Sequence, residues 1–439
     1  MPATRITRLA STLPLVLVLT TTWATVSVLA PQVRADDWPT FGGPDRTSVS
    51  SETNLLDQWS SDGPELLWKA EGVGRGYASP AVSEGRVYTL GDGLSTAAAG
   101  DTDEYLTCFS EKDGQPLWKT KTGPAWTEGK LSWQGSRGTP TVDGAHVYVL
   151  TPHGQLVCAK TENGEIVWQL NLKQDLEGKK ADGWGYSESP LVDGDMLLCT
   201  PGGPQATVVG LNKMTGKVIW KCARPDDVGA GHSSIVISHV GDQKVYVQNT
   251  GGGPMGIAAN GELLWDYDVA PPTAFIPTPI IDNDYVFSVA GYGLGGALLQ
   301  QIPAANGKVS VKEIYGPKTA LGNKHGGVVL VDGNVYGGAE DRNIIYCADL
   351  LTGEILWQKR GSGSNSTAVI AADGKLFVRF QNGTMALAPL DPQGYEETSS
   401  FTTPGSGDSE SPSWAHPVIA NGKLLLREGD AILCYQISQ

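Results

Sequence analysis

Short apolar alternations, separated by turn-forming dipeptides, run along almost the whole chain. Segments such as SPAVSEGRVYTL and TPTVDGAHVYVL alternate apolar with polar or small positions around an acidic-Gly turn. Alternation with a period of two predicts half-buried β-strands, and Asp-Gly and Asn-Gly pairs tolerate the positive φ angles of tight hairpins. Such segments begin near eight positions, which are Pro80, Pro140, Pro190, Ile235, Pro279, Val329, Ile370 and Pro417. A second turn signal in most intervals predicts four strands per repeat and little helix.

A tryptophan phrase repeats with the same spacing. The phrases GQPLW, GEIVW, GKVIW, GELLW and GEILW end at Trp118, Trp168, Trp220, Trp265 and Trp357. Their intervals are 50, 50, 52 and 92 residues, and the last is two periods of 46 with Val311 at the missing Trp position. This period is typical of blade repeats, so we predict an all-β, eight-bladed β-propeller of four-stranded antiparallel blades. The blades around Val311 and Phe401, which lack the Trp, are expected to be weaker.

The two ends of the chain predict how the ring closes. Cys108, Cys158 and Cys347 each stand ten residues before their Trp, and Cys434 has the same local context, but the chain stops before its Trp. The unmatched phrase GPELLW, ending at Trp68, lies near the other end. We therefore expect the N-terminal strand to complete the last blade, which removes the open sheet edges that favour aggregation.

The first 35 residues have the pattern of an export signal. Arg5 and Arg8 precede an uncharged run, and Val33-Arg34-Ala35 offers a small-residue cleavage site. We predict a signal peptide at 1–35, with an uncleaved anchor as the alternative because the run is long. An N-terminal arm at 36–60 and the propeller at 61–439 follow. Either alternative predicts an exported protein of the periplasm or cell envelope, attached to a membrane at most through that anchor.

Charge narrows the choice of partners. The 439-residue chain carries a formal net charge of −15, and no basic stripe stands out along it. Such a surface repels phosphate backbones, so nucleic acid is excluded as a partner. A closed ring has no need of a second copy, and a monomer is expected.

The six cysteines are expected to stay reduced. Cys108, Cys158, Cys347 and Cys434 occupy one equivalent position in four blades, too far apart for the roughly 7 Å that a bridge requires between Cα atoms. Cys199 and Cys222 share a blade and are expected on non-adjacent strands.

The repeats resemble those of a known family. CADLLTGEILW, GLNKMTGKVIW and CAKTENGEIVW are similar to the tryptophan-docking repeat of pyrroloquinoline-quinone (PQQ)-like propellers, and the whole chain resembles an exported planctomycete-type group of them. The group is related to quinoprotein dehydrogenases and to BamB-like assembly lipoproteins. The resemblance implies an eight-bladed ring in which each Trp docks on the neighbouring blade. A structural role is thus expected for Trp68, Trp118, Trp168, Trp220, Trp265 and Trp357.

Residues just before each first strand should surround one mouth of the central channel. The candidates for ligand binding there are Arg75, Tyr77, Arg137, Tyr186, Glu188, His232, Phe275, Lys324, His325, Asn365, Trp414 and His416. A concave site with a few polar groups among aromatic rings is the usual form of a ligand pocket. The alternative is a wet channel whose side chains bond loop backbone and water. No catalytic residue and no metal ligand is assigned.

Two functions remain open. The favoured one is a non-catalytic exported scaffold that binds a protein, peptide or small anionic ligand at the polar mouth. The other, implied by the resemblance, is a PQQ-dependent oxidoreductase acting on alcohols or sugars. Its relatives hold Ca²⁺ with acidic and amide side chains and cover the quinone with a vicinal cysteine pair, whereas this chain has no Cys-Cys and few oxygen ligands at the mouth. Arg and Lys side chains could still grip the carboxylates of PQQ.

Other motifs are weaker. The phrase GYGLGG at 291–296 opens no predicted helix, so a hairpin loop is favoured over a dinucleotide site. An acidic insertion with Asp101, Asp103 and Glu104 could bind Ca²⁺, but a solvated loop is favoured. His232-Ser233-Ser234 lacks the Gly-x-Ser-x-Gly setting of a nucleophile elbow, which argues against a serine hydrolase.

Overall fold

A computed structural model describes residues 1–3, 37–93, 102–406 and 411–439. Its contacts divide the chain into residues 1–32 and residues 33–439. The predicted signal segment, 1–35, lies outside the described residues except for 1–3. None of the helices in the described parts is long and apolar enough to cross a membrane.

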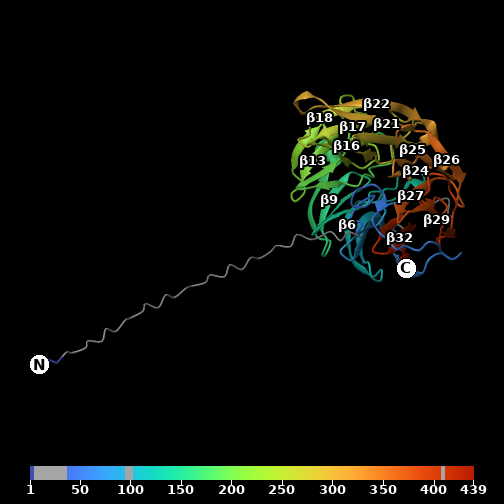
Figure 1. Cartoon of the computed structure of the whole chain (residues 1–439), viewed down its shortest axis with the longest axis horizontal. Coiled ribbons are helices and arrows are strands. Elements are labelled where there is room, and N and C mark those ends of the chain that lie inside the picture. Colours follow the sequence, from blue (N-terminus) through green and yellow to red (C-terminus); the bar gives the residue numbers. More distant parts are fainter. Residues whose placement is uncertain (4–36, 94–101, 407–410) are drawn as a thin grey trace. The chain divides into compact units, whose positions relative to one another are not determined.

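The described residues form eight antiparallel blades around a ring (Figure 1). The first blade contains β3 (Ala81–Ser83), β4 (Arg86–Asp92), β5 (Asp103–Ser110) and β6 (Pro116–Pro124), and the second contains β7 (Thr141–Asp143), β8 (His146–Leu150), β9 (Gln155–Lys160) and β10 (Ile166–Asn171). The third blade contains β11 (Leu191–Asp193), β12 (Met196–Cys199), β13 (Val208–Asn212) and β14 (Val218–Cys222), and the fourth contains β15 (Val236–Val240), β16 (Gln243–Thr250), β17 (Gly253–Ala258) and β18 (Leu263–Asp266).

The fifth blade contains β19 (Ile280–Asp282), β20 (Tyr285–Ala290), β21 (Gly295–Pro303) and β22 (Val309–Lys318), and the sixth contains β23 (Val328–Val331), β24 (Asn334–Ala339), β25 (Ile344–Asp349) and β26 (Ile355–Arg360). The seventh blade contains β27 (Thr367–Ala372), β28 (Lys375–Phe380), β29 (Thr384–Pro389) and β30 (Ser399–Thr402), and β1 (Val49–Ser50) pairs with its first strand. The eighth blade contains β31 (Val418–Ala420), β32 (Lys423–Glu428), β33 (Ala431–Gln436) and β2 (Leu66–Glu71). Among the described residues the helices are one α-helix, α1 (Leu172–Leu176), and short 3₁₀ turns at Leu131–Trp133, Ala305–Gly307, Thr319–Leu321 and Glu340–Arg342. The predicted fold is confirmed.

The ring closes as predicted. Strand β2 pairs antiparallel with β33, with Leu66 opposite Tyr435 and Trp68 opposite Cys434. The predicted hairpins are also present: Asp332 and Gly333, for example, have φ angles of 49° and 75°. All six cysteines are buried and free, and Cys199 and Cys222 lie on β12 and β14, which β13 separates.

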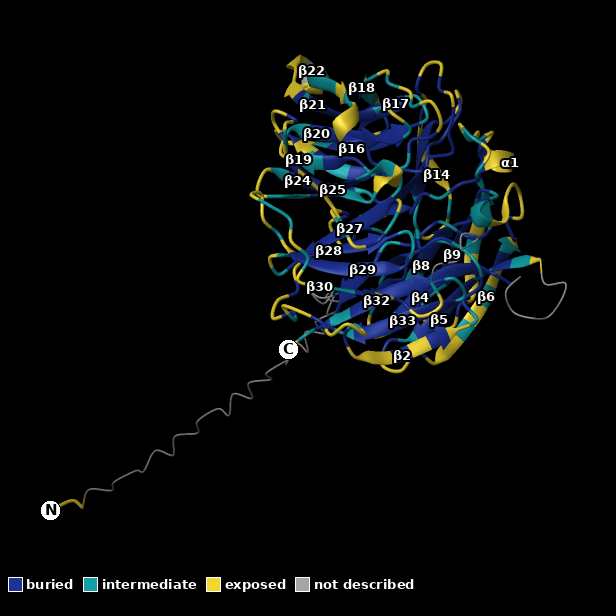
Figure 2. Cartoon of the chain, turned by 90° about the vertical axis from the view of Figure 1, so that its right-hand side faces the viewer, coloured by how far each residue is buried: buried dark blue, intermediate teal, exposed yellow. Residues whose placement is uncertain are grey.

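The hydrophobic core lies between neighbouring blades. One cluster joins Tyr88 and Leu106 of the first blade to Val147 and Val157 of the second. First strands such as β3 and β7 contact each other around the axis. In Figure 2 the outer strands β2 and β6 are largely exposed, whereas β4, β8 and β29 are buried. Because each blade buries its faces against two neighbours, closure of the ring completes the core.

Tryptophans join successive blades by one recurring contact. The Trp68 indole N–H donates to the carbonyl oxygen of Glu111, 2.9 Å away in the next blade, and a Cβ on Gly114 would lie 2.6 Å from its ring. The glycine that opens each Gly-x-x-x-Trp phrase thus makes room for the ring of the preceding blade. The same donation to a backbone carbonyl is made by Trp118, Trp168 and Trp357, while Trp265 donates to the Gln301 side chain. Trp220 packs on Gly261, but its N–H has no partner in the described chain.

The fifth blade, one of the two without this Trp, uses another ring at a different position. Val311 pairs with Gln301 on β21, and one register shift farther along β22, between Glu313 and Tyr315, brings Tyr315 opposite Leu298. The Tyr315 hydroxyl donates to the carbonyl oxygen of Leu350 at 2.8 Å, and a Cβ on Gly353 would lie 2.8 Å from its ring. Val311 therefore marks the Trp position in sequence, but Tyr315 makes the docking contact.

Removing the Tyr315 ring should weaken the interface between the fifth and sixth blades. We expect Tyr315→Ala to lower the free energy of unfolding by about 3 to 5 kcal/mol, and Tyr315→Phe by about 1 kcal/mol because only the hydrogen bond is lost. Val311→Ala is the matched control on the same strand and should cost about 1 kcal/mol. Urea unfolding measures all three, and equal losses for Tyr315→Ala and Val311→Ala would contradict the assignment.

The N-terminal segment, residues 37–60, crosses the channel beside the first hairpin turns. Trp38 forms an antiparallel β-bridge with Val82 of β3, and the Pro39 carbonyl accepts a hydrogen bond from the backbone N–H of Val142 in β7. Beyond a turn, the Arg46 guanidinium donates to the carbonyl oxygens of Ser189 and Ile235, at 3.0 and 2.8 Å. Strand β1 then runs parallel to β27. The segment thus contacts blades on opposite sides of the ring. It closes the channel on one side and forms the floor of the space that remains.

Candidate functional site

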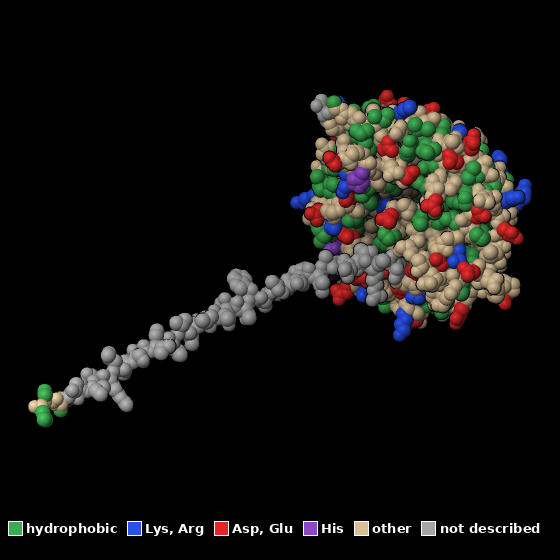
Figure 3. Space-filling model, in the orientation of Figure 1, with side chains coloured by type: hydrophobic (Ala, Val, Ile, Leu, Met, Phe, Trp, Pro, Cys, Tyr) green, Lys and Arg blue, Asp and Glu red, His purple; other side chains and the backbone are tan. Residues whose placement is uncertain are grey.

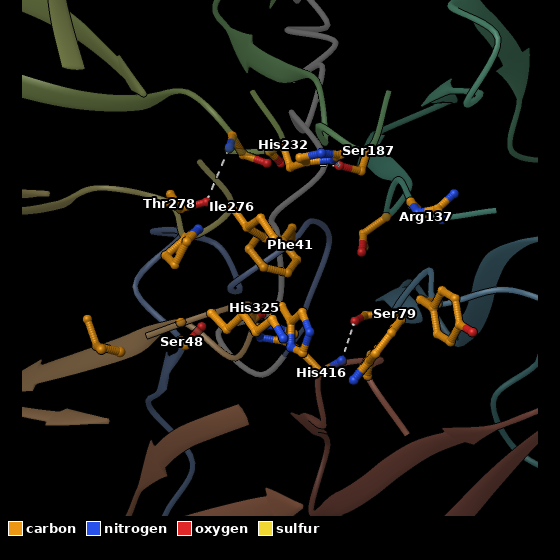
Figure 4. Close-up of a pocket in the computed structure, with 18 of the residues that line it drawn as sticks. Phe41, Ser48, Ser79, Arg137, Ser187, His232, Ile276, Thr278, His325 and His416 are labelled. Atoms are coloured by element: carbon orange, nitrogen blue, oxygen red, sulfur yellow. Dashed lines mark hydrogen bonds between the residues drawn. The ribbon is translucent and has the colours of Figure 1, made fainter. Parts of the chain in front are cut away.

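A pocket of about 380 Å³ occupies the channel above the N-terminal segment. Phe41 lies at the centre of its base, and His232, Ser187 and Arg137 lie along one side (Figure 4). Seven of the residues proposed for the mouth line it, namely Tyr77, Arg137, His232, Lys324, His325, Trp414 and His416. The structure therefore brings together candidates from five blades or the loops that precede them.

The other candidates make internal contacts instead. Arg75 forms an ion pair with Asp92 at 2.8 Å, and the Tyr186 hydroxyl donates to the carbonyl oxygen of Pro201 at 2.7 Å. Glu188 is buried and accepts from the backbone N–H and the hydroxyl of Thr200, at 2.7 and 2.9 Å. The carbonyl of Asn365 accepts the N–H of Asn343. Phe275 is 1% exposed. None of these five side chains is among the described residues that line the pocket.

Aromatic rings that the sequence analysis did not single out complete the wall. Trp133 and Trp184 come from the loops that lead into the second and third blades, and their rings meet edge to face at 5.7 Å. The Phe41 ring meets His416 at 4.8 Å. The sequence signal for the two tryptophans was their place in long insertions between an outer strand and the next first strand. The pocket is thus rich in rings that can pack against a planar or apolar group.

The three pocket histidines are neutral at pH 7. Burial lowers the pKa of His232 to about 4 and that of His325 to about 3, and it also lowers the pKa of His416. A ring nitrogen of His416, Nε2, lies 2.9 Å from the carbonyl oxygen of His325, to which it can donate. Neutral imidazoles offer one donor and one acceptor each, so they provide hydrogen bonds to a ligand but no charge.

Two guanidinium groups bring positive charge to the pocket, Arg46 at its base and Arg137 in its wall. The Arg137 guanidinium donates to the carbonyl oxygens of Gly135, at 3.2 Å, and of Trp133. Burial lowers its pKa to about 10, which leaves it charged at neutral pH. Lys324 is paired with Asp341 at 2.5 Å. No Asp or Glu is among the described lining residues, so the carboxylates nearest in effect to Arg137, Asp182 and Glu104, lie behind the pocket surface.

A chain of polar groups runs along the wall beside Arg137. The Ser187 hydroxyl lies 2.6 Å from Nδ1 of His232, and Nε2 of the same ring lies 2.8 Å from Oδ2 of Asp182. The Asp182 carboxylate also accepts the N–H of Trp184 at 3.0 Å, and it lies 3.9 Å from the ammonium of Lys180. Ser187 stands between Tyr186 and Glu188, which the sequence analysis chose, and Asp182 lies four residues before Tyr186 in the same loop.

The pocket does not fit a calcium-bound quinone. Ca²⁺ takes six to eight oxygen ligands, but the described lining carries no carboxylate, and the described residues hold no group of three His, Cys, Asp or Glu side chains suited to a metal. Glu188, the acid expected at the mouth, is engaged by Thr200. We derive no step through PQQ.

The remaining motifs have structural roles where they are described. Asp103 pairs with Lys121 at 2.7 Å, and Glu104 points into the protein and accepts from Ser136; Asp101 lies outside the described residues. Residues 291–294 of the GYGLGG phrase form the turn between β20 and β21, with no helix after it. On the face shown in Figure 3, acidic and basic side chains are scattered, and no basic stripe suited to nucleic acid is visible.

Comparisons with known proteins agree on the family. The family model described as outer membrane protein assembly factor BamB matches residues 102–359. Two relatives of that name are 22% identical over 266 residues, in Nitrosomonas eutropha, and 26% identical over 192 residues, in Bordetella pertussis. The matches cover 57% and 42% of this chain and 56% and 43% of the relatives, so the chain spans about half the length of the curated relatives it matches.

Solved structures share the fold. The crystal structure of BamB from Moraxella catarrhalis aligns with a TM-score of 0.52 and 15% identity, over 78% of this chain and 94% of that one. A quinohemoprotein alcohol dehydrogenase from Comamonas testosteroni aligns with a TM-score of 0.61 and 14% identity, over 91% and 80%. A europium-containing methanol dehydrogenase reaches 0.64 at 12% identity, over 91% of each chain. These low identities show the fold alone. With more than half of its length matched by the family model, the chain belongs to the BamB-like family of PQQ-type propellers.

Proposed function

We propose that this protein is an exported scaffold of the cell envelope that binds a partner protein and takes an anionic group of that partner into the mouth pocket. Family members are named for the assembly of outer membrane proteins, which supports a protein partner. The pattern of the first 35 residues supports export. A rigid ring that presents loops around a concave site suits recognition of a protein segment.

Arg137 carries the argument for an anionic group. It is partly buried beside aromatic rings, its described hydrogen bonds go to backbone carbonyls, and the lining around it has no carboxylate. A guanidinium in such a place forms strong charge-assisted bonds with a carboxylate. Trp133, Trp184 and Tyr77 in the same pocket would pack against apolar atoms beside the anion. An acidic residue next to an aromatic one is therefore the simplest segment that fits.

A pair of capped dipeptides that differ by one charge tests this proposal. We expect acetyl-Phe-Glu-amide to bind about 10- to 100-fold more tightly than acetyl-Phe-Gln-amide, because the hydrogen bonds to a charged acceptor contribute about 1.5 to 3 kcal/mol. Isothermal titration calorimetry measures both affinities.

The matched variants are Arg137→Gln and Arg360→Gln. Arg360 is an exposed residue on the outer strand β26, so its loss should leave the preference for the acidic peptide unchanged. Arg137→Gln should erase that preference. Equal affinity for the two peptides in the wild type, or a preference that survives Arg137→Gln, would refute the proposal.

A further inference from the structure

Three side chains at the wall of the pocket form a hydrogen-bonded chain of a hydroxyl, an imidazole and a carboxylate. The Ser187 hydroxyl meets Nδ1 of His232 at 2.6 Å, and Nε2 of His232 meets Asp182 at 2.8 Å. Ser187 and His232 both line the pocket and lie side by side in Figure 4. Asp182 and Ser187 belong to the loop between α1 and β11, and His232 belongs to the loop before β15 in the next blade.

The partners fix where the protons are. An ionised carboxylate can only accept, so the His232 proton is on Nε2 and is donated to Asp182. Nδ1 then has a free electron pair and accepts the hydroxyl proton of Ser187. The Asp182 side chain is only 7% exposed, and the N–H of Trp184 and the ammonium of Lys180 hold it in place. This order of groups is the one that activates a serine for nucleophilic attack, whatever the fold or the order in sequence.

We propose that Ser187 is a nucleophile for acyl transfer, with His232 as its general base and Asp182 as the residue that positions the imidazole. The substrate class is a carboxylic ester whose acyl group is small enough to lie among Trp133, Trp184 and Tyr77. This activity goes beyond the scaffold function and does not require it.

The reaction balances with water as the second reactant. Ser187 Oγ forms a bond to the carbonyl carbon of the ester while its proton moves to Nδ1 of His232. Collapse of the tetrahedral intermediate breaks the bond to the leaving alcohol, which takes that proton. Water then gives a proton to Nδ1 and attacks the acyl carbon, and the serine hydroxyl is restored as the carboxylic acid leaves. The charge of Arg137, in the same pocket, favours the oxyanion that forms in both steps.

His232 is unprotonated at neutral pH, although its pKa lies below the range near 7 in which an imidazole is most effective as a general base. Burial and the nearby Lys180 ammonium lower the pKa of His232 to about 4, against the opposing effect of Asp182. The ring is thus unprotonated at pH 7 and ready to accept a proton. When it does, the Asp182 carboxylate stabilises the imidazolium.

A fluorophosphonate reagent tests the nucleophile directly. We expect the full-length protein to form one covalent adduct, mapped to Ser187 by mass spectrometry, and to hydrolyse p-nitrophenyl acetate. Ser187→Ala should abolish both. Ser310→Ala, at an exposed position on β22, is the control and should change neither. Absence of a Ser187 adduct in the wild type would overturn the proposal.

Asp182→Asn tests the positioning role. The maximal rate of labelling should fall about 100- to 10,000-fold, because the amide favours the wrong tautomer of His232, while the concentration of reagent that gives half-maximal rate stays the same. A merely structural role would lower the melting temperature and leave the rate per folded molecule unchanged, and that outcome would also refute the proposal. Arg137-dependent peptide binding is measured separately, so failure of either proposal leaves the other standing.

Discussion

Replacing Trp68 with alanine should lower the free energy of unfolding by about 3 to 5 kcal/mol, the cost of deleting a buried tryptophan ring. The ring is 8% exposed, rests on Gly114 of the next blade, and donates to the carbonyl oxygen of Glu111. Strand β2, which carries it, completes the last blade against β33. Loss of the ring therefore weakens the contact between the closing blade and the first blade, as well as the local packing.

The matched variant is Trp220→Ala, at the contact between the third and fourth blades. Trp220 also packs on a glycine of the next blade, but its N–H has no partner in the described chain. Its loss should cost about 1 kcal/mol less, which is the worth of one hydrogen bond. Urea unfolding gives both values. If Trp68→Ala lowered the free energy of unfolding by less than about 1 kcal/mol, the stability of the propeller would not depend on the Trp68 contact between the last and first blades.

The fold could be predicted in detail because the sequence pattern of one blade recurs eight times. Each hairpin has its own turn signal, and the unmatched phrase at Trp68 has its complement at Cys434, so closure followed from counting. Tyr315 escaped prediction because the docking ring lies four residues beyond Val311, past a register shift in β22. A bulge leaves no clear mark on apolar alternation, so spacing alone could not find it.

The pocket was predicted only in part, because it depends on which way loop side chains point. Tyr186 and Glu188 were chosen, but in an extended segment neighbouring side chains face opposite ways, and Ser187 is the one that faces the pocket. Trp133 and Trp184 lie in separate insertions, and their rings meet at the mouth.

The base of the pocket was unpredictable for a different reason. Arg46 lies in a segment with no repeat to align it, and its hydrogen bonds go to backbone carbonyls more than 140 residues away, at Ser189 and Ile235. Backbone partners at that separation carry no signature in side-chain identity.

Stability should fall as pH rises from 6.5 to 8, because two buried carboxyl groups keep their protons in the folded state over most of that range but are ionised in the unfolded chain. Burial raises the pKa of Glu104 and of Glu188 to about 8, from 4.5 in an unfolded chain, even though Ser136, Thr122 and Thr200 donate hydrogen bonds to them. Between pH 4.5 and 8 the folded state thus binds more protons than the unfolded state, and the free energy of unfolding decreases with pH.

The pocket histidines act in the opposite sense but in a different range. His232 and His325 have folded pKa values of about 4 and about 3, below the 6.5 of an unfolded chain, so their contribution grows as pH rises to 6.5 and is constant above it. Above pH 6.5, therefore, only the two carboxyls among these four groups change the free energy of unfolding with pH. At 1.36 kcal/mol per pKa unit, the loss between pH 6.5 and 8 should be about 3 kcal/mol.

Glutamine at these positions keeps the shape of a protonated carboxyl and cannot ionise. Glu104→Gln and Glu188→Gln should each remove about half of the pH dependence between 6.5 and 8, and the double variant should be nearly flat, whereas Glu354→Gln on the exposed side of a turn should leave it unchanged. Urea unfolding at half-unit pH steps measures the slopes. If the wild type gained stability over this range, or if the double variant kept the full slope, the two carboxyls would be ionised in the folded protein. Their hydrogen bonds from Ser136 and Thr200 would then outweigh the cost of burying the charge.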